Sequence, residues 1–409
     1  MRRHVVPPAP LRAFFGPNAA GVRQGFVALA LNSTTSFVAG AFLGSISSTL
    51  DSKPGLLVLV PAAIGLRGNI FGSFGNRMST AIHSGTFRWS LRRETVLGQN
   101  VLACVVLTMG MSLVLAVEAR GIAGLTPRGS IGILALGTIS IVGGMLASVV
   151  VLVAALGLTA GAVRYNWDLD NVNAPLVSTL GDVLTLPALY LATFLVGVSV
   201  LSSLLGGVLV AAAVVVLAAG WRARGRALRK VVRESTPVLA VAGFISAGAG
   251  VALAHAEPRF DALPALLVLV PAHLSSAGAL GGILSGRLSS KLFLGLVDPD
   301  GWPNREARRD IALVLSLALP VFVFNGLGAG IVANLVGKDG PALLLMVGAS
   351  VLGGLLAIPF VIAVAYYGTI ASYRTGTDPD TYGIPVVSSS VDLVGALALV
   401  AAFALLGLP

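Results

Sequence analysis

The sequence predicts an all-α polytopic membrane protein, on the strength of its composition, its long apolar segments and an internal repeat. Only 11% of the 409 residues are charged and 56% are hydrophobic, whereas a soluble protein carries about a quarter charged residues. Apolar segments of about 20 residues are long enough to cross the hydrocarbon core as helices. Their apolarity is continuous rather than alternating, which excludes a membrane β-barrel.

Eleven such segments predict eleven transmembrane helices. The first is too long for the apolar region of a cleavable signal peptide, and the single cysteine, Cys104, has no second cysteine with which to form an intrachain disulfide. The segments lie near residues 25–46, 55–82, 95–117, 131–160, 174–198, 200–220, 236–254, 263–290, 311–336, 341–368 and 384–408.

Basic residues gather in alternate connections between these segments, which predicts the orientation of the chain. They cluster in the N-terminal tail, at 88–93, at 222–233 and at 291–309. Cytoplasmic loops carry the excess of Lys and Arg, so we expect a cytoplasmic N-terminus, an external C-terminus and a place in the plasma membrane. The net charge is +10, but the basic residues do not alternate with aromatic residues on a polar domain. We therefore expect the lipid bilayer, and no nucleic acid, as partner.

Two copies of one unit make up most of the chain. Residues 56–62 return as residues 266–272, Gly143-Gly144 returns as Gly353-Gly354, and Asp182 returns as Asp392. Each copy holds five predicted helices, an odd number, and the additional helix between them restores the orientation of the second copy. The sequence therefore predicts two parallel repeats related by an axis along the membrane normal.

These repeats set the predicted domain boundaries. We expect a cytoplasmic tail at 1–24, a first repeat at 25–199, a linker helix with a basic loop at 200–235 and a second repeat at 236–409. Such a covalent pseudo-dimer is expected to function as a monomer, although it leaves room for a higher oligomer.

Asp182 and Asp392 are the strongest candidates for a functional site. A charged side chain inside the bilayer is costly and normally serves a function. Pro175 and Pro385 precede them by seven residues and suit the first turn of a helix, so each carboxylate is expected about 10 Å into the membrane. Parallel repeats let both face one axis. The alternative is that each Asp only hydrogen-bonds a neighbouring helix.

The donor set around the two aspartates favours a hard divalent cation. Two facing carboxylates repel each other unless a cation lies between them, and Ser178 and Ser388 each lie about one turn before an Asp. Oxygen donors without a Cys or His cluster favour Mg²⁺ or Ca²⁺ over zinc or copper. Mg²⁺ sheds water reluctantly, so a partly hydrated ion is expected; Mn²⁺ and Co²⁺ are alternative cargo ions.

The second helix of the first repeat is expected to form another wall of the ion path. Its Pro61 and several glycines predict a weakened helix, with Asn69 as a carbonyl ligand or water holder. Close helix packing is the alternative role for the glycines. Arg67, whose counterpart is Ala277, is expected to pair with a carboxylate or with helix-end carbonyls away from the path.

Other polar residues have less specific expected roles. Asp168, Asp170, Asp378 and Asp380 precede the fifth helix of each repeat and form either an acidic vestibule or ordinary turns and helix caps. His273 is expected to be packed and hydrogen-bonded, the 32–36 segment to join helices, and Arg77 and Arg287 to extend toward the membrane surface.

The residues Pro61, Gly65 to Asn69, Arg77 to Thr80 and Gly181-Asp182 together resemble the membrane domain of the MgtE superfamily of magnesium transporters. The resemblance is closest to the duplicated form in animal magnesium solute carriers and covers both repeats. It implies a Mg²⁺-selective pore lined by the second and fifth helices, with Asp182 and Asp392 in place of the central aspartate of the family. The second repeat departs from the pattern at residues 275–279. The resemblance does not extend to the regulatory domains of the bacterial family, so gating through such domains is not expected.

The expected function is therefore transport of a divalent cation, with Mg²⁺ as cargo, and no catalytic residue is predicted. An exchanger coupled to Na⁺ or H⁺ is the alternative within transport. A Mg²⁺-dependent membrane prenyltransferase is an alternative of another class, but it requires longer aspartate motifs and leaves Asp182 and Asp392 unexplained. A structural scaffold that carries no ion flux is the third alternative.

Overall fold

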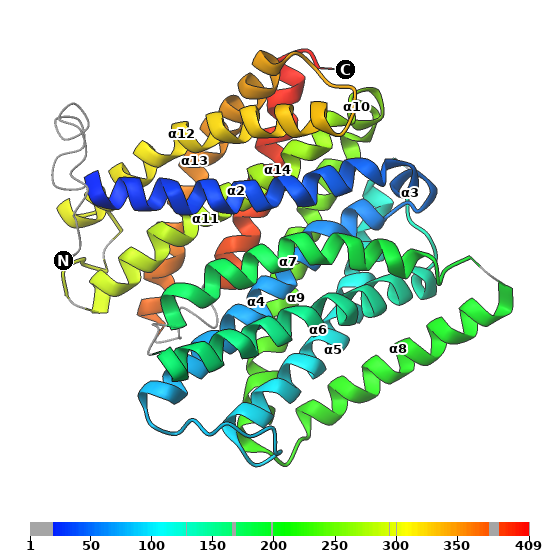
Figure 1. Cartoon of the computed structure of the whole chain (residues 1–409), viewed down its shortest axis with the longest axis vertical. Coiled ribbons are helices and arrows are strands. Elements are labelled where there is room, and N and C mark those ends of the chain that lie inside the picture. Colours follow the sequence, from blue (N-terminus) through cyan, green and yellow to red (C-terminus); the bar gives the residue numbers. More distant parts are fainter. Residues whose placement is uncertain are drawn as a thin grey trace.

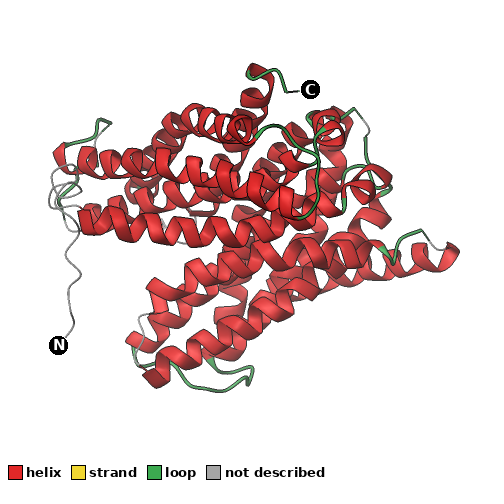
Figure 2. Cartoon of the chain, turned by 45° about the horizontal axis from the view of Figure 1, so that its top comes forward, coloured by secondary structure: helices red, strands yellow, loops and turns green. Residues whose placement is uncertain are grey.

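The structure is a computed structural model that describes residues 19–127, 129–165, 169–197, 199–293, 295–299, 301–375 and 384–408. Within these ranges every regular element is a helix (Figure 2). Side chains at 19–24, 83, 169–178, 199–201, 290, 293 and 384 are outside the description.

Eleven long helices form the molecule, one for each predicted segment. The first repeat holds α2 (Ala19–Ser45), α4 (Leu56–His83), α5 (Val96–Ile122), α6 (Ile133–Tyr165) and α7 (Leu169–Thr193), and α8 (Ser199–Trp221) follows. The second repeat holds α9 (Arg226–His255), α11 (Ala265–Phe293), α12 (Arg305–Leu335), α13 (Leu343–Arg374) and α14 (Ile384–Leu405). In the part of the chain that is described, ten of them, all except α7, meet the length and apolarity required of a membrane span. The predicted polytopic α fold is confirmed.

The repeat extends to the short elements and to the packing. α3 (Ser47–Ser52) follows α2 as α10 (Glu257–Ala262) follows α9, whereas η2 (Ala123–Leu125) follows α5 alone. α2 packs against α11 of the other repeat, and α9 packs against α4. α8 has no counterpart; it lies along the outside of the bundle, against α5, α6 and α9 (Figure 1).

Three helices differ from expectation. α9 begins at Arg226, so basic residues expected in a loop form its first turns. α7 begins at Leu169, so the prediction that Pro175 lies in a first turn is wrong, whereas Pro385 is the second residue of α14. α4 is continuous across Pro61 and its glycines, so the expected weakening does not break it. An unbroken helix satisfies its own backbone groups, which lipid cannot do.

Two glycines allow the two repeats to pack closely against each other. A Cβ on Gly40 of α2 would lie 2.3 Å from the Val268 carbonyl oxygen of α11, and one on its counterpart Gly250 of α9 would lie 2.4 Å from that of Val58 in α4. Any side chain there would collide with backbone, which cannot rotate away. Small residues at these crossings therefore set how closely the repeats approach each other.

We expect Gly250→Val to separate α9 from α4 and to lower the thermal unfolding temperature in detergent. Forcing extra methyl groups into a packed interior costs about 1–3 kcal/mol. Gly157→Val is the control, because a Cβ there meets nothing within 4 Å. Equal unfolding temperatures for the two variants would contradict the proposed crossing.

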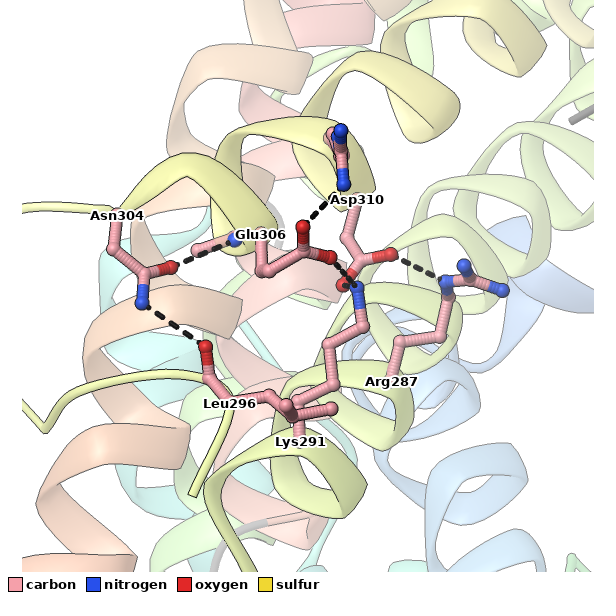
Figure 3. Close-up of polar contacts among 8 residues, drawn as sticks. Arg287, Lys291, Leu296, Asn304, Glu306 and Asp310 are labelled. Atoms are coloured by element: carbon pink, nitrogen blue, oxygen red, sulfur yellow. Dashed lines mark hydrogen bonds and ion pairs between the residues drawn. The ribbon is translucent and has the colours of Figure 1, made fainter. Parts of the chain in front are cut away.

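A charged cluster joins α11 to α12 near one end of the bundle (Figure 3). The buried Asp310 carboxylate lies 2.8 Å from Arg287 Nε and 2.8 Å from Lys291 Nζ, while Glu306 bonds Lys291 and Arg309. In the first repeat, Arg77 Nε donates to Asn100 Oδ1 at 2.6 Å. Arg77 and Arg287 therefore join neighbouring helices, in addition to any anchoring at the membrane surface.

We expect Asp310→Ala to lower the unfolding temperature more than Asp310→Asn does. Removing one partner of a buried ion pair costs about 3–5 kcal/mol, whereas Asn keeps an acceptor for Arg287, as Asn100 does for Arg77 in the first repeat. Thermal unfolding of both variants in the same detergent measures the difference. An Asp310→Ala variant as stable as the unmodified protein would show that Asp310 does not hold the two cations.

Candidate functional site

Asp182 and Asp392 lie inside the bundle, in α7 and α14, and each accepts hydroxyl hydrogen bonds. Ser36 of α2 donates to Asp182 Oδ2 at 3.4 Å, and Ser246 of α9 donates to Asp392 Oδ2 at 3.4 Å. Ser36 and Ser246 are repeat counterparts, so one polar contact appears twice.

Each aspartate also faces the second helix of the other repeat. Ser275 of α11 donates to Asp182 Oδ2 at 3.1 Å. At the matching position of α4 stands Gly65, where a Cβ would lie 3.7 Å from Asp392 Oδ2. Both carboxylates therefore lie at the interface between the repeats, as a shared site requires.

The serines expected beside the aspartates have other partners. Ser388 donates to the Pro385 carbonyl at 3.1 Å, and Thr185, one turn after Asp182, donates to the Gly181 carbonyl at 2.6 Å. The side chain of Ser178 is outside the described residues. A hydroxyl one turn from an Asp on the same helix is better placed for the backbone of that helix, so the ligand role predicted for Ser388 finds no support in the structure.

Asn69 is half-buried and lines two narrow hollows in succession. The first also touches Ser246 and Ser389; the second also touches Ser73, Ser235 and Arg77. They run between α4, α9 and α14, with α5 beside the second. Asn69 lies one turn along α4 from Gly65, which faces Asp392; its role as a carbonyl ligand or water holder stays a prediction.

Glycines on α4 and α11 face open space instead of a neighbouring helix. A Cβ on Gly68 or Gly72, or on their counterparts Gly278 and Gly282, would meet no atom within 4 Å. The close-packing alternative is therefore wrong for these four positions. The second helix of each repeat presents a bare backbone face there.

Arg67 is fully buried but has no counter-ion among the described residues. Its Nη1 donates to the Ala63 carbonyl one turn earlier in α4, and its Nε and Nη2 have no partner. The guanidinium extends toward Gly144 of α6 and Ser112 of α5, within its own repeat. Neither expected partner, a carboxylate or a helix-end carbonyl, bonds it among the described residues, because the Ala63 carbonyl lies within α4. In the second repeat, Phe322 fills the corresponding space against Gly354.

His273 is packed as expected, but the hydrogen bond is missing. Its ring lies 5.0 Å from that of Phe322, centroid to centroid, and neither ring nitrogen has a partner in the described chain. Gly353 makes room for the ring, since a Cβ there would lie 3.0 Å from His273 Cε1.

The expected acidic vestibule cannot be located. Asp168, Asp378 and Asp380 lie outside the described residues, and Asp170 lies in the first turn of α7 without a described side chain. Within the described ranges no three His, Cys, Asp or Glu side chains gather as a metal cluster.

The sequence indicated the 32–36 segment but not its partner Ser276, nor Asn325 or Ser246. Asn32 Nδ2 donates to Ser275 Oγ at 2.8 Å, Ser33 bonds Ser276 at 3.0 Å, and Asn325 Nδ2 donates to Ser276 Oγ at 2.8 Å. The 32–36 segment thus joins α2 to α11, as expected. Extending the repeat comparison to Ser36 and Ser246 would have indicated both hydroxyls.

The fold and the site together define an integral membrane protein of two helical repeats with an acidic pair at their interface. The sequence model of MgtE, described as a divalent cation transporter, matches residues 60–193 and 270–402. The chain belongs to the MgtE family of divalent cation transporters, a family of transporters and not of enzymes.

Relatives among characterised proteins agree with this assignment. Solute carrier family 41 member 2 of Homo sapiens is 24% identical over 85% of this chain, and that of Gallus gallus is equally similar. Solute carrier family 41 member 3 of Rattus norvegicus is 26% identical over 33% of the chain and 30% of its own length. The chain spans 63% of the length of the two member 2 proteins.

One solved structure is similar along the chain. It is the inward-facing conformation of a multidrug resistance MATE family transporter of the MOP superfamily, at 11% identity, a TM-score of 0.31 and 93% coverage of both chains. A likeness of this degree carries no argument about fold or function.

Substitution of Arg67 tests whether its guanidinium has a stabilising partner. We expect Arg67→Met to leave the thermal unfolding temperature unchanged within about 3 °C or to raise it, because an apolar side chain replaces a buried cation without a counter-ion. Thermal unfolding in detergent measures this, with Lys291→Met, which breaks the contact with Asp310, as the destabilised comparison. A marked loss of stability in Arg67→Met would reveal a partner of the guanidinium.

Proposed function

We propose that this chain moves divalent cations across the membrane, with Mg²⁺ as its main cargo, through a path at the interface of the two repeats. One observation carries the proposal: two carboxylates at matching positions, Asp182 and Asp392, lie at the interface between the repeats, where each accepts a hydrogen bond from a serine. Carboxylates in a low-dielectric interior require hydrogen bonds or a cation. A divalent ion between them balances both charges.

The polar side chains near the two aspartates suit an ion that keeps part of its hydration shell. Described groups near the aspartates are hydroxyls and one amide, from Ser36, Ser246, Ser275, Ser389 and Asn69. Oxygen donors suit Mg²⁺, which retains several waters in protein sites. The bare glycine faces of α4 and α11 leave room beside these donors for water bound to the ion. The same donors accept Mn²⁺ or Co²⁺.

The proposed orientation is a plasma membrane protein with a cytoplasmic N-terminus and an external C-terminus. Basic residues support it, because Arg88, Arg92 and Arg93 lie between α4 and α5, and a second group lies around the start of α9. Both places are on the side predicted to be cytoplasmic. The chain is proposed to act as a single pseudo-dimer.

We expect Asp182→Asn and Asp392→Asn each to reduce Mg²⁺ flux into proteoliposomes, and the double variant to abolish it. Loss of one charged ligand is expected to cost about 1.4 kcal/mol or more of Mg²⁺ binding free energy, which lowers the affinity about tenfold or more. A trapped fluorescent Mg²⁺ indicator measures the flux. Asp310→Asn, in the α11–α12 cluster, is the control that keeps transport.

Normal flux in the double variant would overturn the site assignment. Absence of Mg²⁺ flux in the unmodified protein would overturn the transport proposal. Repeating the assay with and without a Na⁺ or H⁺ gradient separates a channel from a coupled exchanger, because only the exchanger requires the gradient.

A further inference from the structure

The two halves of the interface differ in how far they satisfy their carboxylate. Asp182 accepts from two hydroxyls, Ser36 and Ser275. Asp392 accepts from Ser246 alone among the described residues, since Gly65 stands where Ser275 would be. Asp182 is 7% exposed, whereas Asp392 belongs to the half-buried residues. Asp392 therefore retains more free lone pairs.

The walls beside the two carboxylates differ in the same sense. On the Asp392 side, Asn69, Ser73 and Ser389 line the hollows. The counterparts of Asn69 and Ser73 are Ala279 and Ile283. Acceptors for the waters of a hydrated ion are thus concentrated between α4, α9 and α14.

Polar groups on the Asp182 side bond to one another instead. Asn32 donates to Ser275, and Ser33, Ser276 and Asn325 form a buried chain of hydrogen bonds linking α2, α11 and α12. A side chain that already bonds a protein neighbour gives up that bond to accept from ion-bound water. The α2–α11 side keeps one acceptor without a partner among the described residues, the buried Asn325 Oδ1, and otherwise offers the ion less.

We propose that the ion is held off the pseudo-twofold axis, by Asp392, Asn69 and Ser389, while Asp182 is the anchored half that supplies charge from a distance. This inference rests on the proposed function and assigns unequal roles within it. The ligand is a hydrated divalent cation, bound through its waters to the α4, α9 and α14 wall.

The repeat offers a matched exchange of side chains as the test. Gly65→Ser places a hydroxyl beside Asp392 in space open to a Cβ, since the nearest atoms lie 3.7 and 3.8 Å away. Ser275→Gly removes the corresponding hydroxyl from Asp182. Mn²⁺ binding to the purified full chain, followed by electron paramagnetic resonance and by competition with Mg²⁺, reads affinity without requiring flux.

We expect Gly65→Ser to weaken Mn²⁺ binding about tenfold, as changes next to a metal ligand do, and Ser275→Gly to change it less than about threefold. Asn69→Ala is expected to weaken binding similarly, whereas Ala279→Asn leaves it unchanged. Thermal unfolding of each variant confirms that the chain remains folded. Equal effects of Gly65→Ser and Ser275→Gly, or a larger effect of Ser275→Gly, would overturn the off-axis site.

Mn²⁺ binding also distinguishes failure of the off-axis site from failure of the shared acidic site. If the unmodified chain binds Mn²⁺ and the exchanged variants respond equally, the off-axis site is wrong and the shared acidic site stands. If the unmodified chain and the Asp182→Asn/Asp392→Asn double variant bind Mn²⁺ equally, the acidic site itself is wrong, and the off-axis inference is overturned with it.

Discussion

The need to satisfy a carboxylate in the interior of a membrane protein is the constraint on which the arrangement of these helices depends. Asp182 and Asp392 come from the fifth helix of each repeat, and each accepts from a serine of the first helix of the same repeat. Asp182 also accepts from Ser275 in the second helix of the other repeat, where Asp392 faces Gly65. This requires α2 to cross α11, and α9 to cross α4, at close range. Glycines at Gly40 and Gly250 permit that approach.

Much of the fold could be predicted because lipid imposes strict rules on sequence. Long apolar segments cannot be loops, and charged residues inside them stand out, so the helices, the repeat and the acidic pair were accessible without coordinates. Continuity of α4 was not, because a proline and several glycines weaken a helix in water, whereas lipid penalises every unpaired backbone group.

The partners of the acidic pair were harder to predict. Ser275 is 93 residues from Asp182 in sequence, and Ser36 is 146 residues away, so spacing within one helix could not reveal them. It favoured Ser178 and Ser388, and Ser388 instead bonds to the backbone of its own helix. The isolation of Arg67 was equally inaccessible, because a counter-ion is a property of the packed interior and not of the local sequence.

The linker helix α8 has a consequence beyond connecting the repeats. In an assembly of two identical subunits, every substitution occurs twice and both halves change in step. Because α8 joins the halves within one polypeptide, each can diverge on its own: glycine at 65 with serine at 275, or arginine at 67 with alanine at 277. A peripheral helix that touches neither aspartate thereby permits division of labour between two inherited copies.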